Sequence, residues 1–227
     1  MTKFSDIKGF AFDLDGVIAD TARFHAVAWK QVADKVNVPW SDDLSEDLKG
    51  ISRMESLELI LSRGGKANEF TEEQKLKMAD SKNENYKKLI STLTSADILP
   101  GMQDFIKSVR KAGYKTAIAS ASHNAPYILE RLRLDSEFDG IVDPAILKAG
   151  KPDPEIFQKA AELMNLQPSA VIGLEDASAG IESINAAGET SLGIGDKRVL
   201  NAADLLFANT EEVTLNAIKT QLHIDNR

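Results

Sequence analysis

The sequence predicts an α/β protein in which a parallel sheet is flanked by helices and interrupted by one inserted helical domain. Short apolar runs alternate with amphipathic helical patterns over most of the chain. This alternation is typical of parallel sheets, whose strands are buried on both faces and joined by helical crossovers. The stretch from Thr21 to Ala96 is the exception, because its patterns are helical and no run in it resembles a strand. A helical stretch that follows the first strand in this way indicates an insertion.

Each element follows from a local pattern. Short apolar runs predict strands at Gly9–Phe12, Thr116–Ala119, Gly140–Val142, Ala170–Leu174, Ser191–Ile194 and Leu205–Phe207. Helices are expected between the later strands at Met102–Ala112, Ala125–Leu134, Pro154–Asn165 and Ser178–Ala187. The inserted stretch has helical patterns at Phe24–Val36, Arg53–Ser62 and Glu72–Leu93. The expected architecture is a Rossmann-like core of residues 1–18 and 97–227 and a helical cap domain of residues 19–96.

The composition is that of an ordinary globular protein. The 227 residues suffice for one large domain, or for a domain with an insert. A net charge of −8 disfavours nucleic acid and anionic membranes as partners. The chain has no cysteine, which excludes disulfides and thiolate metal sites, and no run approaches the ~20 apolar residues of a membrane span. We therefore expect a cytoplasmic protein. No heptad pattern indicates self-association, so we also expect a monomer.

Two carboxylates follow the first expected strand. Asp13 and Asp15 are two residues apart at its carboxyl end, where open parallel sheets bind ligands. Their mutual repulsion is relieved by a cation or a shared proton, and carboxylate oxygens suit Mg²⁺. The alternative is a turn or helix start at Asp15-Gly16.

A second acidic pair favours the metal interpretation. Glu175 and Asp176 directly follow the expected strand Ala170–Leu174. Taken alone, they are typical of a helix start, with Asp176 or Ser178 as the N-cap. Two acidic pairs at two strand ends are better explained by a metal site built from Asp13, Asp15, Glu175 and Asp176.

Two further segments suit an anion. Ser120-Ala-Ser122-His123-Asn124 ends one strand and begins a helix, so that hydroxyls and free N–H groups gather there; N-capping by Ser122 or Asn124 is the equal alternative. Lys151 precedes Pro-Asp-Pro, which is itself explained as a helix start. The lysine is not explained in that way, and one positive charge near the carboxylates would stabilise a phosphoryl group.

Other catalytic templates are absent from the sequence. There is no Gly-x-x-x-x-Gly-Lys-Ser/Thr loop and no Gly-x-Ser-x-Gly motif, and the histidines lack zinc spacing. Aromatic and methionine residues of the insert are expected to form its helical core: Phe24, Trp29, Met54, Met78 and Tyr86.

The order of these motifs resembles a known family. Asp13-Leu-Asp15-Gly-Val, Ser120, Lys151-Pro and Gly-Leu-Glu175-Asp176 are similar to the four motifs of the haloacid dehalogenase-like phosphotransferases. The helical insert resembles the small cap domain of that family. More narrowly, three segments resemble the branch that isomerises β-glucose 1-phosphate: Asp15–Ala22 with His25 and Trp29, Leu48–Ser56, and Ser120–Leu129.

The resemblance implies a mechanism. Asp13 is expected to be the nucleophile that forms an aspartyl-phosphate, and Asp15 the acid and base. Mg²⁺ is expected on Asp13, the Asp15 carbonyl, Asp176 and Glu175. Ser120 and Lys151 are expected to bind the transferring phosphoryl group. The reaction implied converts β-D-glucose 1-phosphate to D-glucose 6-phosphate, with glucose 1,6-bisphosphate as the priming intermediate.

The same resemblance assigns the remaining sugar-phosphate contacts. Arg53 is expected to join Ser122, His123 and Asn124 at a second phosphate. Without the resemblance, a solvated helix start capped by Ser52 is the favoured explanation of Arg53. Lys49, Gly50 and Lys82 are expected near the sugar or Asp15, and Thr21 and His25 at the hinge. Trp29 and Ser56 lie in the matching motifs and are expected to line the substrate site.

Two positions depart from the pattern, and two other functions compete. His123 stands where lysine is common, and Ala177 stands where a serine usually follows the aspartate. A magnesium-dependent sugar-phosphate phosphatase shares every core residue and differs in whether water is excluded. A catalytically idle sugar-phosphate binding protein is the alternative from another class, although Asp13 and Asp15 are both present.

Overall fold

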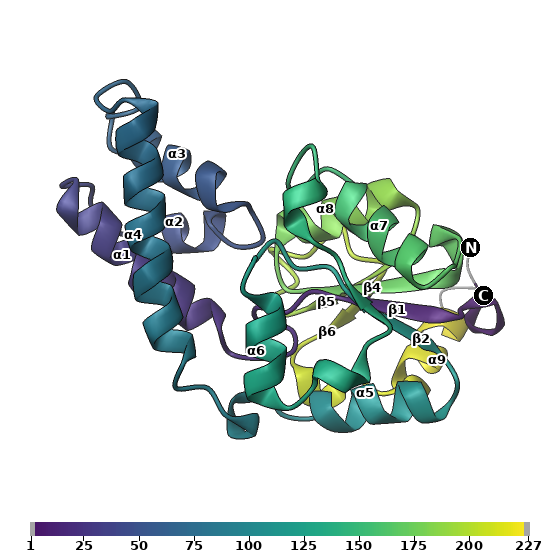
Figure 1. Cartoon of the computed structure of the whole chain (residues 1–227). Coiled ribbons are helices and arrows are strands. Elements are labelled where there is room, and N and C mark those ends of the chain that lie inside the picture. Colours follow the sequence, from purple (N-terminus) through teal and green to yellow (C-terminus); the bar gives the residue numbers. More distant parts are fainter. Residues whose placement is uncertain (1–2, 225–227) are drawn as a thin grey trace.

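A computed structural model describes residues 3–224 and contains a six-stranded parallel sheet with the order β3-β2-β1-β4-β5-β6 (Figure 1). The strands are β1 (Gly9–Phe12), β2 (Lys115–Ile118), β3 (Gly140–Ile141), β4 (Val171–Glu175), β5 (Thr190–Ile194) and β6 (Leu205–Phe207). The predicted α/β class and all six strands are therefore confirmed. The chain order reverses at β1, which lies between β2 and β4, so the sheet opens a ligand crevice beyond the carboxyl end of β1.

Two helical layers cover the sheet. The helices are α1 (Ala22–Lys35), α2 (Asp42–Asp47), α3 (Arg53–Arg63), α4 (Glu72–Ile90), α5 (Met102–Lys111), α6 (Ala125–Leu132), α7 (Glu155–Leu163), α8 (Ser178–Ala187) and α9 (Leu215–Ile224). Helices α7 and α8 lie on one face, and α5, α6 and α9 lie on the other (Figure 1). In the described part of the chain, no helix is both long and apolar enough to cross a membrane.

The sequence of β1 explains the difference between the two layers. Phe10 and Phe12 pack with Phe105 of α5, whose ring is edge-on to that of Phe10 at 5.7 Å. Ala11 points to the opposite face and packs with the α7 and α8 residues. The small side chain of Ala11 lets helices α7 and α8 approach the sheet closely. Gly173 of β4 has the same effect, because a Cβ at Gly173 would lie 2.7 Å from Ile184 Cγ1.

Helices α1 to α4, which we call the helical block, stand at the end of the sheet opposite α9 (Figure 1). The block has its own core, which includes Trp29, Leu57 and Leu61. The two segments that join it to the sheet run side by side, since Leu99 N–H donates to Ile18 C=O at 2.9 Å and Ala19 pairs with Ile98. The sequence patterns do not predict helices α2 and α9. Helix α2 has six residues and buries only Leu44, so its sequence shows no repeating apolar pattern.

Glu189, immediately before β5, is a buried acid with no partner. The residue is 5% exposed, and neither carboxyl oxygen has a hydrogen-bond partner among the described residues. A Cβ at Gly173 would lie 2.9 Å from Glu189 Oε2, so the carboxyl is packed against the backbone of β4. Burial raises the pKa of Glu189 well above its ordinary value of 4.5. The folded protein therefore holds this side chain as a neutral acid.

We predict that Glu189→Met stabilises the protein by about 1–3 kcal/mol at pH 8 and by less at pH 5. Above pH 4.5 the unfolded chain releases the proton that the folded chain keeps. The unfolding free energy of the original protein therefore falls by up to about 1.4 kcal/mol per pH unit until the raised pKa is reached. The variant lacks this dependence. Urea unfolding at both pH values measures the difference.

Glu182→Met is the matched control, since Glu182 is exposed on the neighbouring helix α8. This control should change stability equally at both pH values. A stability gain in Glu189→Met that is independent of pH would show that Glu189 is ionised in the folded state.

Candidate active site

Asp13 lies at the carboxyl end of β1, where the backbone still follows the sheet. Asp13 N–H donates to Leu174 C=O at 3.0 Å, which continues the pairing of β1 with β4. Gly16 has φ +84°, and a Cβ there would lie 2.2 Å from Asp176 Oδ2. Only glycine therefore fits this turn while Asp176 approaches from β4. This local geometry brings the two acidic pairs together, as the sequence predicts.

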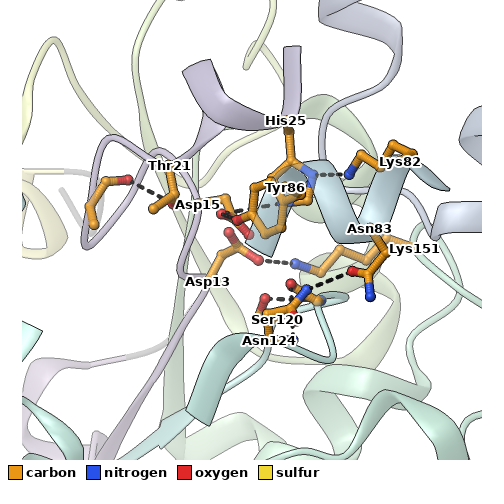
Figure 2. Close-up of polar contacts among 12 residues, drawn as sticks. Asp13, Asp15, Thr21, His25, Lys82, Asn83, Tyr86, Ser120, Asn124 and Lys151 are labelled. Carbon is orange, nitrogen blue, oxygen red and sulfur yellow. Dashed lines mark hydrogen bonds and ion pairs between the residues drawn. The ribbon is translucent and has the colours of Figure 1, made fainter. Parts of the chain in front are cut away.

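Lys151 bridges two of these carboxylates in the protein interior, and Figure 2 shows its contact with Asp13. Its Nζ donates to Asp13 Oδ1 at 2.6 Å and to Glu175 Oε2 at 2.8 Å, and the lysine side chain is completely buried. Burial alone would lower the pKa of Lys151, but Asp13 and Glu175 outweigh it and the pKa is raised. Lys151 therefore remains a cation and holds Asp13 in place. Removing one member of such a buried pair leaves an uncompensated charge.

Three carboxylates form a candidate metal site. Oxygens of Asp13, Glu175 and Asp176 all lie within 4.8 Å of one another. Burial, followed by the charge of Asp13, raises the pKa of Glu175 to about 8. The pKa of Asp176 is raised to about 7, also mainly by burial. Excess negative charge on hard oxygen donors fits Mg²⁺, which these three residues could hold. The side chain of Asp15 is not part of this group.

Asp15 is instead surrounded by side chains of the helical block (Figure 2). Tyr86 donates its hydroxyl to Asp15 Oδ1 at 3.3 Å, and His25 Nε2 lies 3.6 Å from the same oxygen. Burial raises the pKa of Asp15, against the opposing effects of Thr21, Lys82 and Tyr86. A raised pKa suits a carboxyl group that must carry a proton.

His25 is held as a neutral ring. Its pKa is well below the usual value because of burial and the nearby positive charges of Lys82 and Arg53. Lys82 Nζ lies 2.7 Å from His25 Nδ1, and burial lowers the pKa of Lys82 to about 7. When Lys82 donates to Nδ1, the imidazole proton lies on Nε2, which faces Asp15.

The loop after β2 is built from short polar contacts. Ser120 Oγ accepts from Ser122 N–H at 3.1 Å, and Ser122 Oγ accepts from Asn124 N–H at 3.3 Å. Asn124 Nδ2 donates to Asn83 Oδ1 of α4 at 3.1 Å, which links this loop to the helical block. Asn124 occupies the N-cap position of α6, but its side chain makes no capping hydrogen bond.

The other capping alternatives are also corrected. The N-cap of α8 is Ala177, so neither Asp176 nor Ser178 caps that helix. Asp176 and Asn124 are therefore not explained by helix capping. Ser52 does cap α3 in a reciprocal arrangement with Glu55, but Arg53 is half-buried rather than fully solvated, and burial lowers its pKa.

One cavity of about 490 Å³ lies between the helical block and the sheet. Most predicted site residues line it: Asp13, Asp15, His25, Trp29, Lys49, Gly50, Arg53, Ser56, Lys82, Ser122, His123, Asn124 and Lys151. Four predicted residues do not line it: Thr21, Ser120, Glu175 and Asp176. Thr21 and Ser120 are buried. The structure therefore gathers the predicted residues around one space.

The loop before α3 reaches the carboxylate cluster. Lys49 Nζ lies 2.8 Å from Glu46 and 3.7 Å from Asp176 Oδ2. Burial tends to lower the pKa of Lys49, but these two acids raise it overall. Gly50 has φ +74°, and a Cβ there would lie 3.3 Å from Ala177 Cβ. The loop is thus pressed closely against the end of β4.

Several residues of the site were not predicted from the sequence, and three of them carry polar groups of interest: Asn83, Tyr86 and Lys148. Asn83 and Lys148 line the cavity, and Tyr86 touches Asp15. Tyr86 was expected only in the core of the insert. It is indeed fully buried, but its hydroxyl has a polar partner. In the sequence, only the closeness of Asn83 and Tyr86 to Lys82 on the same helix could have indicated that they belong to the site.

Comparisons with known proteins agree with one another. A family model described as haloacid dehalogenase-like hydrolase matches residues 7–188. A β-phosphoglucomutase of Bacillus subtilis is 43% identical, covering 93% of this chain and 94% of that protein. A phosphorylated carbohydrates phosphatase of Thermotoga maritima is 30% identical, covering 93% and 98%. A crystal structure of β-phosphoglucomutase from Clostridium difficile superposes with a TM-score of 0.93 at 43% identity, covering 97% and 99%.

The carboxylate cluster predicts a crossover in stability with Mg²⁺. In EDTA, Asp176→Asn should be at least as stable as the original protein, because it removes one of the repelling charges. In Mg²⁺ at a hundred times the dissociation constant, the melting temperature of the original protein should rise by roughly 5–10 °C. The variant should gain little. Thermal unfolding in both buffers measures this.

Asp135→Asn, an exposed change ahead of β3, is the control and should keep the full Mg²⁺ response. An equal response in Asp176→Asn would show that the cation binds elsewhere.

Proposed function

This chain belongs to the haloacid dehalogenase-like hydrolase family, and from that premise we propose that it acts as a β-phosphoglucomutase, interconverting β-D-glucose 1-phosphate and D-glucose 6-phosphate. One observation carries the proposal. A single cavity is lined both by the carboxylates Asp13 and Asp15 with Lys151 and by a second set of anion-binding groups that includes Arg53. A sugar bisphosphate has two phosphates, and the cavity has a polar site for each. The similarity to β-phosphoglucomutases over nearly the whole chain supports the same function.

In the proposed reaction, a carboxylate oxygen of Asp13 attacks the phosphorus of a sugar phosphate. The bond between phosphorus and the sugar oxygen breaks, and Asp15 gives its proton to that oxygen. In the reverse sense, Asp15 accepts the proton of the next attacking hydroxyl. Phospho-Asp13 thus converts β-glucose 1-phosphate into glucose 1,6-bisphosphate. When the bisphosphate rebinds in the opposite orientation, the enzyme recovers its phosphoryl group and releases glucose 6-phosphate.

Charges in the site support this assignment. Lys151 contacts Asp13 directly, so it can neutralise both the nucleophile and the transferring phosphoryl group. Asp13, Glu175 and Asp176 would hold Mg²⁺. Bound Mg²⁺ supplies further positive charge at the phosphoryl oxygens. Ser120, buried just after β2, would donate to the same group.

The helical block would act as the cap domain, spanning residues 19–96 between core segments 1–18 and 97–227. It supplies Arg53 for the second phosphate and places Lys49 and Gly50 over the sugar. His25 and Lys82 from the block surround Asp15, so the acid group would be correctly arranged only when the block is closed and water is excluded. A cytoplasmic monomer with small sugar phosphates as its only partners remains our prediction.

A sugar-phosphate phosphatase is the second candidate. The phosphorylated carbohydrates phosphatase from Thermotoga maritima is 30% identical over 93% of this chain. Its chemistry requires the same nucleophile, acid and metal site. The two functions differ in whether water or a sugar hydroxyl attacks phospho-Asp13. An idle binding protein is disfavoured, since Asp13 is held by Lys151 in the arrangement that a nucleophile needs.

The decisive experiment supplies β-glucose 1-phosphate, Mg²⁺ and a trace of glucose 1,6-bisphosphate, and measures glucose 6-phosphate and free phosphate together. We expect glucose 6-phosphate to exceed phosphate by at least about tenfold. Asp13→Asn should abolish both products, because the amide is a poor nucleophile. Stoichiometric phosphate without isomerisation would instead establish the phosphatase. The absence of both products would favour the binding protein.

Arg53→Ala tests the second phosphate site. Losing a charge-assisted hydrogen bond of about 1.5–3 kcal/mol should raise the KM for β-glucose 1-phosphate by roughly 10- to 100-fold. Phosphorylation of Asp13 by acetyl phosphate, which has no second phosphate, should be unchanged. Arg63→Ala, at the exposed far end of α3, is the control. An unchanged KM in Arg53→Ala would remove Arg53 from the substrate site.

A further inference from the structure

Tyr86 on α4 carries a polar group that core packing does not require. The side chain is completely buried and belongs to the main hydrophobic core. Its ring lies 3.9 Å from the ring of His25, centroid to centroid, and Lys82 Nζ lies 4.7 Å from the Tyr86 centroid. A phenylalanine would make all these ring contacts. The hydroxyl is the additional feature, and a buried hydroxyl needs a hydrogen-bond partner.

The partner of this hydroxyl is the carboxyl group proposed as acid and base. Tyr86 Oη donates to Asp15 Oδ1 at 3.3 Å (Figure 2). Burial and the adjacent Asp15 raise the pKa of Tyr86 well above its usual value, so the phenol keeps its proton and acts as a donor. His25 Nε2 approaches the same oxygen at 3.6 Å. Tyr86 and His25, both from the helical block, therefore contact the same oxygen, Oδ1.

These contacts to Oδ1 suggest different roles for the two carboxyl oxygens of Asp15. An oxygen that accepts a hydrogen bond is held in orientation, whereas its neighbour remains available to exchange a proton. We propose that Tyr86 is a positioning residue that holds Asp15 by Oδ1, so that Oδ2 exchanges the proton with the sugar oxygen. This inference rests on the proposed mutase function, because it assigns a role relative to the acid and base of that reaction.

The placement of Tyr86 also links the acid to the position of the helical block. Tyr86 and His25 come from α4 and α1, whereas Asp15 belongs to the turn after β1. The hydrogen bond therefore exists only while the block is seated against the sheet. A phosphoenzyme with the block displaced would lack this positioning, and Asp15 would be less able to assist attack on phospho-Asp13. In this way Tyr86 favours sugar over water as the acceptor.

The test compares two phosphoryl donors in Tyr86→Phe, which keeps the ring and removes only the hydroxyl. Glucose 1,6-bisphosphate has an alkoxide leaving group that needs a proton, whereas acetyl phosphate has an acetate leaving group that does not. We expect phosphoryl transfer from the bisphosphate to Asp13 to slow by roughly 10- to 100-fold, and phosphorylation by acetyl phosphate to change less than about twofold. The KM for β-glucose 1-phosphate should be unchanged. Rapid-quench measurement of the phosphoenzyme gives both rates.

Two further variants separate positioning from structure. Asp15→Asn removes the acid, so adding Tyr86→Phe to it should cause no further loss with the bisphosphate. Tyr114→Phe removes a tyrosine hydroxyl from a partly buried ring elsewhere and should alter neither rate. Equal slowing with both donors would show that Tyr86 serves only structure, and full activity with both would show that its hydroxyl is dispensable. If the original protein forms no phosphoenzyme with either donor, the proposed function itself is overturned.

Discussion

The buried bridge from Lys151 to Asp13 and Glu175 is the interaction on which the site depends. The strand order places β1 beside β4, so the acidic residues that end these strands converge, and their charges repel one another in a medium of low dielectric. Lys151 is 138 residues from Asp13 in the chain and offsets part of this repulsion. The remaining negative charge would favour the binding of a divalent cation at this candidate site. One constraint, the need to balance charge at adjoining strand ends, thus explains the lysine, the metal site and the orientation of the nucleophile.

The sheet and the helical block contribute different parts of the chemistry. In the proposed mechanism the sheet supplies groups that must be rigid: Asp13 directly after β1, Glu175 on β4 and the lysine between them. In that mechanism the block supplies groups whose effect depends on closure, including Arg53 and the pair of side chains next to Asp15. Asp15 lies where the two meet. A phosphotransferase that must avoid water benefits from this division, since its nucleophile can be preorganised while its acid is assembled only around a substrate.

Much of this arrangement could be read from the sequence, for a definite physical reason. Parallel strands end at one edge, so Asp13, Ser120 and Glu175 could be brought together by counting strands alone. The apolar runs that mark the strands are easily recognised because both faces of the sheet are buried.

Contacts between the sheet and the helical block could not be predicted in this way. Tyr86 lies 71 residues from Asp15, and its spacing on α4 identifies a buried position without revealing where the hydroxyl reaches. Helix α9 does have apolar residues at helical spacing, Leu215, Ile218 and Leu222, but a single period near the end of the chain was too little to decide. Glu189 could not be anticipated at all, since an acid before a strand is normally exposed.

The paired connections between the sheet and the helical block also bear on how such a protein can diversify. Ala19 pairs with Ile98, so the chain leaves the sheet and returns to it at adjacent points. The entropy of closing a loop grows only slowly with its length. An insert of another size or shape can therefore occupy this position without stretching or displacing β1. Substrate recognition can be exchanged as a module in evolution or in engineering, while the phosphoryl-transfer chemistry beneath it is inherited unchanged.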